Sequence, residues 1–231
     1  MIFDKKIEDE ALAFVKKSKK EIKARFAVGG DSESEEKPIS IFMAGSPGAG
    51  KTEFSKRFLK EAQIDMVRID ADEIRDFIPQ YDGKNAANIQ RASALAVEYL
   101  HDEVLKRKKH MILDATFADY DKSRQNVKRS IDKARHIEIY YLYQDPLVAW
   151  EFTKAREEME GRVVPKDIFV DSFFKARQNV KKAKDEFGSK VQLHLVIKDY
   201  DNSFDLLKLN ISEVDSYMNM DYDYTSLMEK L

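Results

Sequence analysis

Short apolar runs alternate with longer amphipathic stretches through most of this chain. The runs with the length of buried strands are residues 39–44, 66–69, 110–113, 136–143 and 191–196. The stretches with apolar positions at helical spacing are residues 51–62, 85–108, 120–133, 146–160 and 165–187. This alternation predicts an α/β fold, with a parallel sheet of about five strands and helices on both faces.

The two ends of the chain differ from this central pattern. Residues 5–26 mix Lys and Glu with apolar positions and predict an amphipathic helix within an N-terminal unit, residues 1–28. Residues 29–37 are acidic and glycine-containing and predict a flexible linker. A main domain then covers residues 38–231, and we expect it to end in a C-terminal helix from residue 203.

Composition narrows the classes of protein that fit. With 231 residues, 43% of them hydrophobic, the chain can bury one sizeable core, and its formal net charge of -2 gives no global attraction for nucleic acid. The absence of cysteine excludes disulfides and Cys-ligated zinc. Without an apolar run of membrane-spanning length, we expect no membrane association and a cytoplasmic location.

The first strand runs into a phosphate-binding sequence. Gly45-Ser46-Pro47-Gly48-Ala49-Gly50-Lys51-Thr52 matches the pattern G-x-x-x-x-G-K-[ST] between a predicted strand and a predicted helix. Glycines let successive backbone N–H groups turn inward, and the following helix adds its positive N-terminal dipole. We expect Lys51 to bridge the β- and γ-phosphates of ATP or GTP, and the hydroxyl of Thr52 to bind Mg²⁺. This is the P-loop NTPase signature.

Carboxylates at the ends of two predicted strands indicate which type of phosphate chemistry the site supports. Asp114 ends one strand and could hold Mg²⁺ through water, but the residues after it supply no hydrolysis motif. Asp70 and Asp72 follow the strand 66–69, at the sheet edge where open α/β folds bind ligands. Asp72 can accept the proton of a substrate hydroxyl that attacks the γ-phosphate, which indicates a kinase. Either aspartate could instead cap the helix that begins near Glu73.

Two arginines flank a break between predicted helices. Arg156 and Arg162 lie on either side of EEMEG, and Gly161 with Pro165 marks a bend there. A bend could aim both guanidinium groups at the transferring phosphoryl group, as a lid. The alternative is that Arg156 pairs with Glu160 on a solvated helix.

Together, GSPGAGKT, the strand-end segments DAD and DAT, and the segments KAREE and GRVVPK resemble the zeta toxin family. The resemblance implies a nucleoside-kinase-like P-loop kinase that phosphorylates the 3′-hydroxyl of UDP-N-acetylglucosamine and is restrained by an epsilon-like antitoxin. It implies that Lys51, Asp72, Arg156 and Arg162 are catalytic. It also implies that Glu98, Asp114 and Thr116 lie beside the substrate.

The sequence is also compatible with other functions. The acceptor could be an antibiotic, another metabolite or a nucleic-acid end, although the charge balance makes nucleic acid an unfavoured partner. A nucleotide-binding regulator without acceptor turnover also fits the P-loop. The N-terminal helix could pack on the core through its apolar stripe, or restrain the nucleotide cleft from within the chain.

Overall fold

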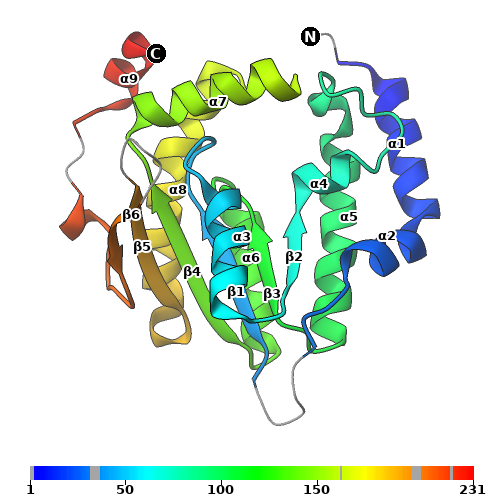
Figure 1. Cartoon of the computed structure of the whole chain (residues 1–231), viewed down its shortest axis with the longest axis horizontal. Helices are drawn as coiled ribbons and strands as arrows, with labels where there is room; N and C mark the ends of the chain where they lie inside the picture. The colour runs from blue at the N-terminus through cyan, green and yellow to red at the C-terminus, as the bar shows by residue number, and fades with distance from the viewer. Residues whose placement is uncertain (1–2, 32–36, 162, 199–203, 219–220) are drawn as a thin grey trace.

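A six-stranded sheet lies at the centre of the computed structural model, which describes residues 3–31, 37–161, 163–198, 204–218 and 221–231. The strand order is β2-β3-β1-β4-β5-β6 (Figure 1). Five strands are parallel: β1 (Ile39–Ala44), β2 (Val67–Asp70), β3 (Met111–Asp114), β4 (His136–Tyr143) and β5 (Gln192–Lys198). They confirm the predicted α/β fold, with strand ends that shift by one or two residues.

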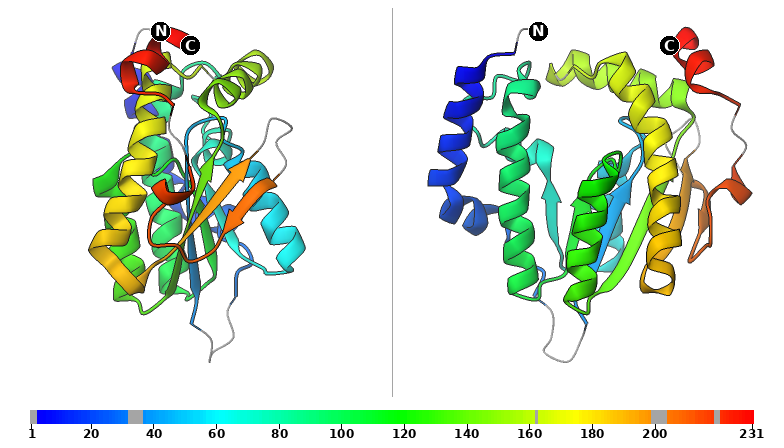
Figure 2. Two further views of the ribbon diagram at one scale, coloured as in Figure 1. Left: turned by 90° about the vertical axis from the view of Figure 1, so that its left-hand side faces the viewer. Right: turned by 180° about the vertical axis from the view of Figure 1, so that it is seen from behind.

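Alternate residues of β1 point to opposite faces of the sheet, as its strand geometry requires. Ile41 and Met43 pack with α3 (Lys51–Ala62), while Phe42 and Ala44 belong to the larger core on the other face. That second face is covered by α5 (Ala86–Lys106), α6 (Tyr120–Asp132) and α8 (Lys166–Phe187), which lie in front of the sheet when it is seen from behind (Figure 2). The prediction of helices on both faces is therefore confirmed.

Two helices complete the carboxyl-terminal edge of the sheet, where the parallel strands end. α4 (Ala71–Arg75) follows β2 directly. α7 (Pro146–Glu160) follows β4 and crosses above the edge (Figure 1). The Asp145 side chain accepts hydrogen bonds from the backbone N–H groups of Leu147 and Val148, and Pro146 occupies the first turn, so this sequence starts a helix at a fixed place.

The N-terminal segment forms two helices where one was predicted. α1 (Lys5–Lys17) and α2 (Lys19–Phe26) meet at Ser18, a poor residue for a helix interior, and this break corrects the continuous helix over residues 5–26. Both helices lie against α5 (Figure 1). Ala11, Val15 and Ile22 are fully buried in the same core cluster as the sheet, which supports the packing role of this segment.

The start of the predicted linker is attached to the sheet. Gly30 donates its N–H to Asp65 Oδ2 at 2.8 Å, and its carbonyl accepts from the His110 N–H at 2.6 Å. Gly29 accepts from the Lys109 ammonium. The middle of the linker, residues 32–36, falls outside the described residues.

The predicted C-terminal helix from residue 203 is wrong for most of its length. β6 (Phe204–Lys208) pairs antiparallel with β5, and a short 3₁₀ turn, Asp215–Tyr217, follows. Within the described part of residues 204–231, α-helix is confined to α9 (Tyr224–Lys230). The open edge of β5 explains the difference. The sequence of a short apolar run is compatible with helix or strand, but only a strand can pair with the unpaired backbone N–H and C=O groups at that edge. Within the described part of the chain, no helix has the length and apolar character needed to cross a bilayer.

Candidate active site

The loop between β1 and α3 follows a backbone path that only glycine allows. Gly45 and Gly48 have φ angles of 141° and 74°. A Cβ at Gly48 would lie 1.9 Å from the carbonyl oxygen of Ala149, and one at Gly45 would lie 2.5 Å from that of Leu142. The loop is thus seated directly against β4 and the first turns of α7, and its shape is fixed by that contact.

Two side chains that follow the loop point back toward it. Lys51 donates from Nζ to the carbonyl oxygens of Gly45 and Ser46, at 3.0 and 2.7 Å. Thr52 donates from Oγ1 to Oδ2 of Asp114, at 3.1 Å. Lys51 therefore places its ammonium over the loop, and the Thr52 hydroxyl meets the carboxylate at the end of β3.

Asp114 lies in register with Asp70 on the neighbouring strand β2. Burial raises the pKa of Asp114, and the nearby charge of Asp70 raises it further, while Lys51 and Arg68 act in the opposite direction. A hydroxyl and a buried carboxylate in contact form a pair of hard oxygen donors, which is the chemistry that Mg²⁺ prefers. The pair formed by Thr52 and Asp114 therefore fits a magnesium ion.

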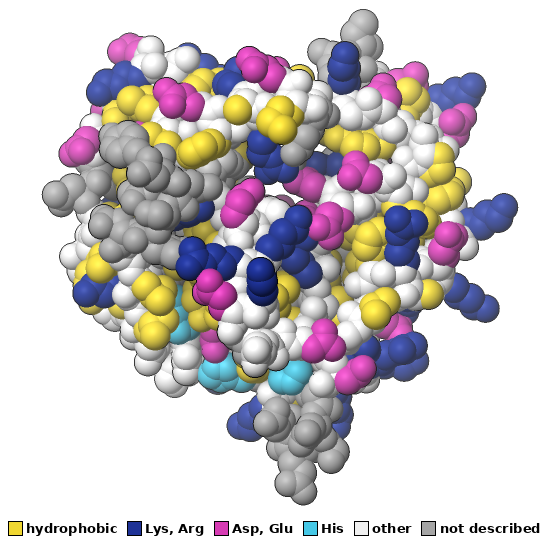
Figure 3. All heavy atoms as spheres, in the orientation of Figure 1, with side chains coloured by type: hydrophobic (Ala, Val, Ile, Leu, Met, Phe, Trp, Pro, Cys, Tyr) yellow, Lys and Arg dark blue, Asp and Glu magenta, His cyan; other side chains and the backbone are white. Residues whose placement is uncertain are grey.

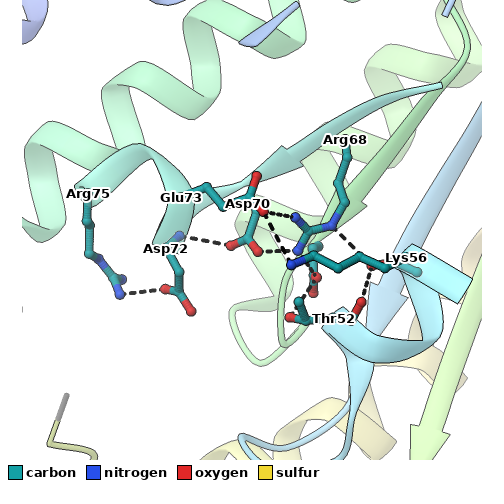
Figure 4. A network of polar contacts seen from close by, with 9 residues as sticks. Thr52, Lys56, Arg68, Asp70, Asp72, Glu73 and Arg75 are labelled. Atoms are coloured by element: carbon teal, nitrogen blue, oxygen red, sulfur yellow. Dashed lines mark hydrogen bonds and ion pairs between the residues drawn. The ribbon is translucent and has the colours of Figure 1, made fainter. Parts of the chain in front are cut away.

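Arg68 holds the two strand-end carboxylates together (Figure 4). Its Nη2 contacts both Asp70 and Asp114, the latter at 2.9 Å, and its Nη1 donates to Glu73 at 2.5 Å. Arg68 was not predicted as a site residue from the sequence. A signal was present, since residues two apart on a strand share a face and Arg68 stands two before Asp70.

Asp70 and Asp72 have different partners, which separates the capping role from the candidate catalytic role. Asp70 caps α4, because its Oδ1 accepts from the Asp72 N–H at 2.8 Å. The Asp72 carboxylate turns away from the cap and accepts from Arg75 Nη1 at 2.6 Å (Figure 4). Of the two aspartates, Asp72 is therefore the one whose side chain lines the cleft without serving as the helix cap.

These groups line one cleft of about 460 Å³ below α7. Acidic and basic side chains gather around this hollow in the space-filling view (Figure 3). Its walls come from the P-loop, the ends of β2 and β3, α5 and α7; the polar lining includes Lys51, Thr52, Asp72, Arg75, Gln90, Asp114, Thr116 and Arg156. The cleft thus brings together most of the residues predicted for the site.

Two predicted site residues need separate comment. Glu98 lies on an exposed face of α5, 3.7 Å from Lys122, and is not among the residues that line the cleft. Gln90, about two turns earlier on the same helix, lines it instead. The placement of Glu98 was predicted from its spacing along the sequence, and the structure puts its side chain on a face of α5 that does not line the cleft. Arg162 lies outside the described residues, and Gly161, with φ 74°, ends α7 just before it.

Thr116 connects the end of β3 to the P-loop. Its carbonyl oxygen accepts from the Gly45 N–H at 3.0 Å, and its hydroxyl accepts from the Ala118 N–H at 3.3 Å. The next residue, Phe117, is buried with a positive φ of 63°. Asn179 on α8 holds this turn by donating from Nδ2 to the carbonyls of Phe117 and Ala118, at 2.9 and 2.8 Å.

Solved structures share this fold. A chain of the PezAT chromosomal toxin–antitoxin system of the human pathogen Streptococcus pneumoniae is 20% identical, with a TM-score of 0.64 over 96% of this chain and 88% of that one. The native AvrRxo1-ORF1:-ORF2 complex matches at 12% identity and a TM-score of 0.66, over 90% of this chain and 71% of that one. The same complex with ATP matches at 13% identity and a TM-score of 0.57, over 88% of this chain and 64% of that one.

The family assignment rests on the sequence itself. The zeta toxin family model matches residues 25–211, which include both walls of the cleft and helix α7 above it. This match agrees with the P-loop, the strand-end carboxylates and the kinase-type arrangement described above. The chain belongs to the zeta toxin family.

Proposed function

We propose that this chain is an ATP-dependent kinase that transfers the γ-phosphate to the 3′-hydroxyl of the amino sugar in UDP-N-acetylglucosamine. The observation that carries the proposal is that the P-loop and the Asp72 carboxylate line the same cleft from opposite sides of β3. Family membership supports the reaction class, and a fold neighbour that contains ATP supports the choice of nucleotide over GTP.

The P-loop holds the nucleotide in this proposal. Backbone N–H groups of residues 45–52 and the N-terminal end of α3 surround the phosphates, and Lys51 neutralises their outer oxygens. Thr52 and Asp114 hold Mg²⁺, which when bound neutralises charge on the phosphate oxygens. These contacts orient the terminal phosphate toward the other wall of the cleft.

Asp72 acts on the acceptor. Its carboxylate accepts the proton of the attacking hydroxyl, whose oxygen forms the new bond to phosphorus as the bond to the leaving ADP oxygen breaks. Arg156, on the helix that covers the cleft, stabilises the charge of the transferring group, and we keep Arg162 as its proposed partner. Asp114 and Thr116 lie near the acceptor, whereas Glu98 has no part in the proposed site.

We also propose a protein partner and a place of action. One fold neighbour is named as part of a toxin–antitoxin system and another as a two-component complex, which supports an antitoxin for this chain. ATP and nucleotide sugars are available in the cytoplasm, so we place the reaction there.

The test is transfer of labelled phosphate. Purified protein with Mg²⁺ and γ-labelled ATP is incubated with UDP-N-acetylglucosamine, other sugars, aminoglycosides and a 5′-hydroxyl oligonucleotide, and GTP replaces ATP in a parallel series. We expect label in UDP-N-acetylglucosamine. Label in another acceptor would reject the substrate but keep the kinase, and nucleotide binding without transfer to any acceptor would indicate a regulator.

A further inference from the structure

One buried arginine on α4 joins the proposed base to a residue of the neighbouring helix α5. Arg75 is only 7% exposed, donates from Nη1 to Asp72 at 2.6 Å, and donates from Nη2 to Gln90 Oε1 at 2.9 Å. Asp72 and Gln90 therefore contact the two terminal nitrogens of a single guanidinium group. Both side chains line the cleft, so a ligand that reaches one also lies beside the other.

The contact with Arg75 sets the orientation of the Gln90 amide. A guanidinium group only donates hydrogen bonds, so the amide must turn its oxygen toward Arg75. The Nε2 group, with its two N–H donors, is then the part of the exposed Gln90 side chain that is left for a ligand. The Nε2 donor is held in place because Arg75, which binds the oxygen of the same amide, is buried and has little freedom to move.

We propose that Gln90 is a specificity-determining residue that donates a hydrogen bond to an amide carbonyl on the acceptor, next to the hydroxyl that Asp72 activates. This inference rests on the proposed kinase function and deepens it. Arg75 acts as a positioning residue, since it holds the Asp72 carboxylate and the Gln90 amide at a fixed separation. Neither residue was predicted from the sequence.

The chemistry of the acceptor fits this geometry. In a 2-acetamido sugar, the carbon that carries the acetamido group is bonded to the carbon that carries the 3-hydroxyl. A base on the hydroxyl and an N–H donor on the acetamido carbonyl must therefore be close neighbours, as Asp72 and Gln90 are through Arg75. A sugar with a hydroxyl at that carbon offers no carbonyl to Gln90. The cleft is thus expected to select acetamido sugars.

The experiment crosses two acceptors with variants of the full chain. kcat and KM are measured for UDP-N-acetylglucosamine and for UDP-glucose, with wild type and Gln90→Ala. We expect wild type to prefer the acetamido sugar, and Gln90→Ala to lower kcat/KM for it about 10-fold, mainly through KM, with little effect on UDP-glucose. Gln125→Ala, an exposed glutamine on α6, is the matched control and is expected to leave the preference unchanged.

Arg75→Lys tests the positioning role. Lysine keeps the charge but contacts one partner at a time, so kcat should fall at least 10-fold with both acceptors while ATP affinity is retained. Arg135→Lys is the control for loss of a buried guanidinium, because Arg135 bonds Ser40 and the carbonyl of Ile39, at the opposite end of the sheet from the cleft. It is expected to lower stability without changing kcat.

The outcomes separate this inference from the proposed function. If wild type transfers phosphate to UDP-N-acetylglucosamine but Gln90→Ala keeps its preference, or loses activity equally with both sugars, the role of Gln90 is rejected and the kinase stands. If wild type phosphorylates both sugars equally well, acetamido selection is also rejected. If wild type transfers phosphate to neither, the proposed function fails, and the inference fails with it.

Discussion

Charge at the cleft is balanced residue by residue. Asp70 and Asp114 lie on adjacent strands in register, and Arg68 contacts both of them. Without that guanidinium group, two buried carboxylates would repel each other, and leaving them unpaired would cost several kcal/mol. The pKa of Asp114 is raised, chiefly by burial, so a cation bound beside this carboxylate would favour its charged form.

The buried histidine on α5 has a pH-dependent effect on folding. The pKa of His101 is lowered from 6.5 to about 3, first by burial and then by the charge of Arg129. The folded pKa lies below the unfolded one, so the stabilisation is complete above about pH 6.5 and is lost as pH falls toward 3. We expect this residue alone to cost the wild type roughly 2 kcal/mol of unfolding free energy at pH 5 relative to pH 7.

Urea denaturation of wild type and His101→Gln at pH 7 and pH 5 measures this effect. The variant is expected to lose less stability than wild type between the two pH values, because glutamine does not titrate. An equal loss in both proteins would show that His101 does not contribute to acid sensitivity.

At the level of elements, α8 supports the nucleotide loop from behind the sheet. Asn179 holds the turn at Phe117, and that turn leads through Thr116 to the N–H of Gly45. We expect Asn179→Leu to lower the unfolding free energy by about 2 kcal/mol, because one buried and one partly buried carbonyl lose their donor. ATP affinity should fall as well, since Gly45 loses a fixed partner.

Urea denaturation and calorimetric titration with Mg²⁺-ATP check this prediction. Gln178→Ala, an exposed neighbour on the same helix, serves as control and is expected to behave as wild type in both measurements. If Asn179→Leu binds ATP as tightly as the control, the turn at Phe117 does not support the loop.

The elements also explain which features the sequence predicts. The parallel strands and the P-loop follow from local patterns, because buried strands and glycine-rich turns are encoded by neighbouring residues. The pairing of Arg75 with Asp72 was accessible too, as residues three apart on a helix lie together. The role of Gln90 could not be predicted from the sequence, because its contact with Arg75 depends on how α5 packs against α4. β6 was not predicted for a related reason, because this segment forms a strand through its pairing with β5, which local sequence does not reveal.

For the whole molecule, the N-terminal helices are part of the core. Ala11, Val15 and Ile22 are fully buried, and Glu8 contacts Arg91 on α5 at 3.1 Å. We expect removal of residues 1–28 to expose the apolar face of α5 and to lower the denaturation midpoint strongly, without raising ATP turnover. A folded truncated protein with much higher turnover would instead support an internal restraint.

The central claim is that one cleft has a nucleotide-binding wall and a separate carboxylate that activates the acceptor. It is tested most directly by measuring ATP affinity and phosphate transfer to UDP-N-acetylglucosamine in wild type and Asp72→Asn. We predict near-normal ATP affinity and a fall in transfer of about 10²-fold or more in the variant, as expected for loss of a general base. Transfer at the wild-type rate by Asp72→Asn would contradict the account.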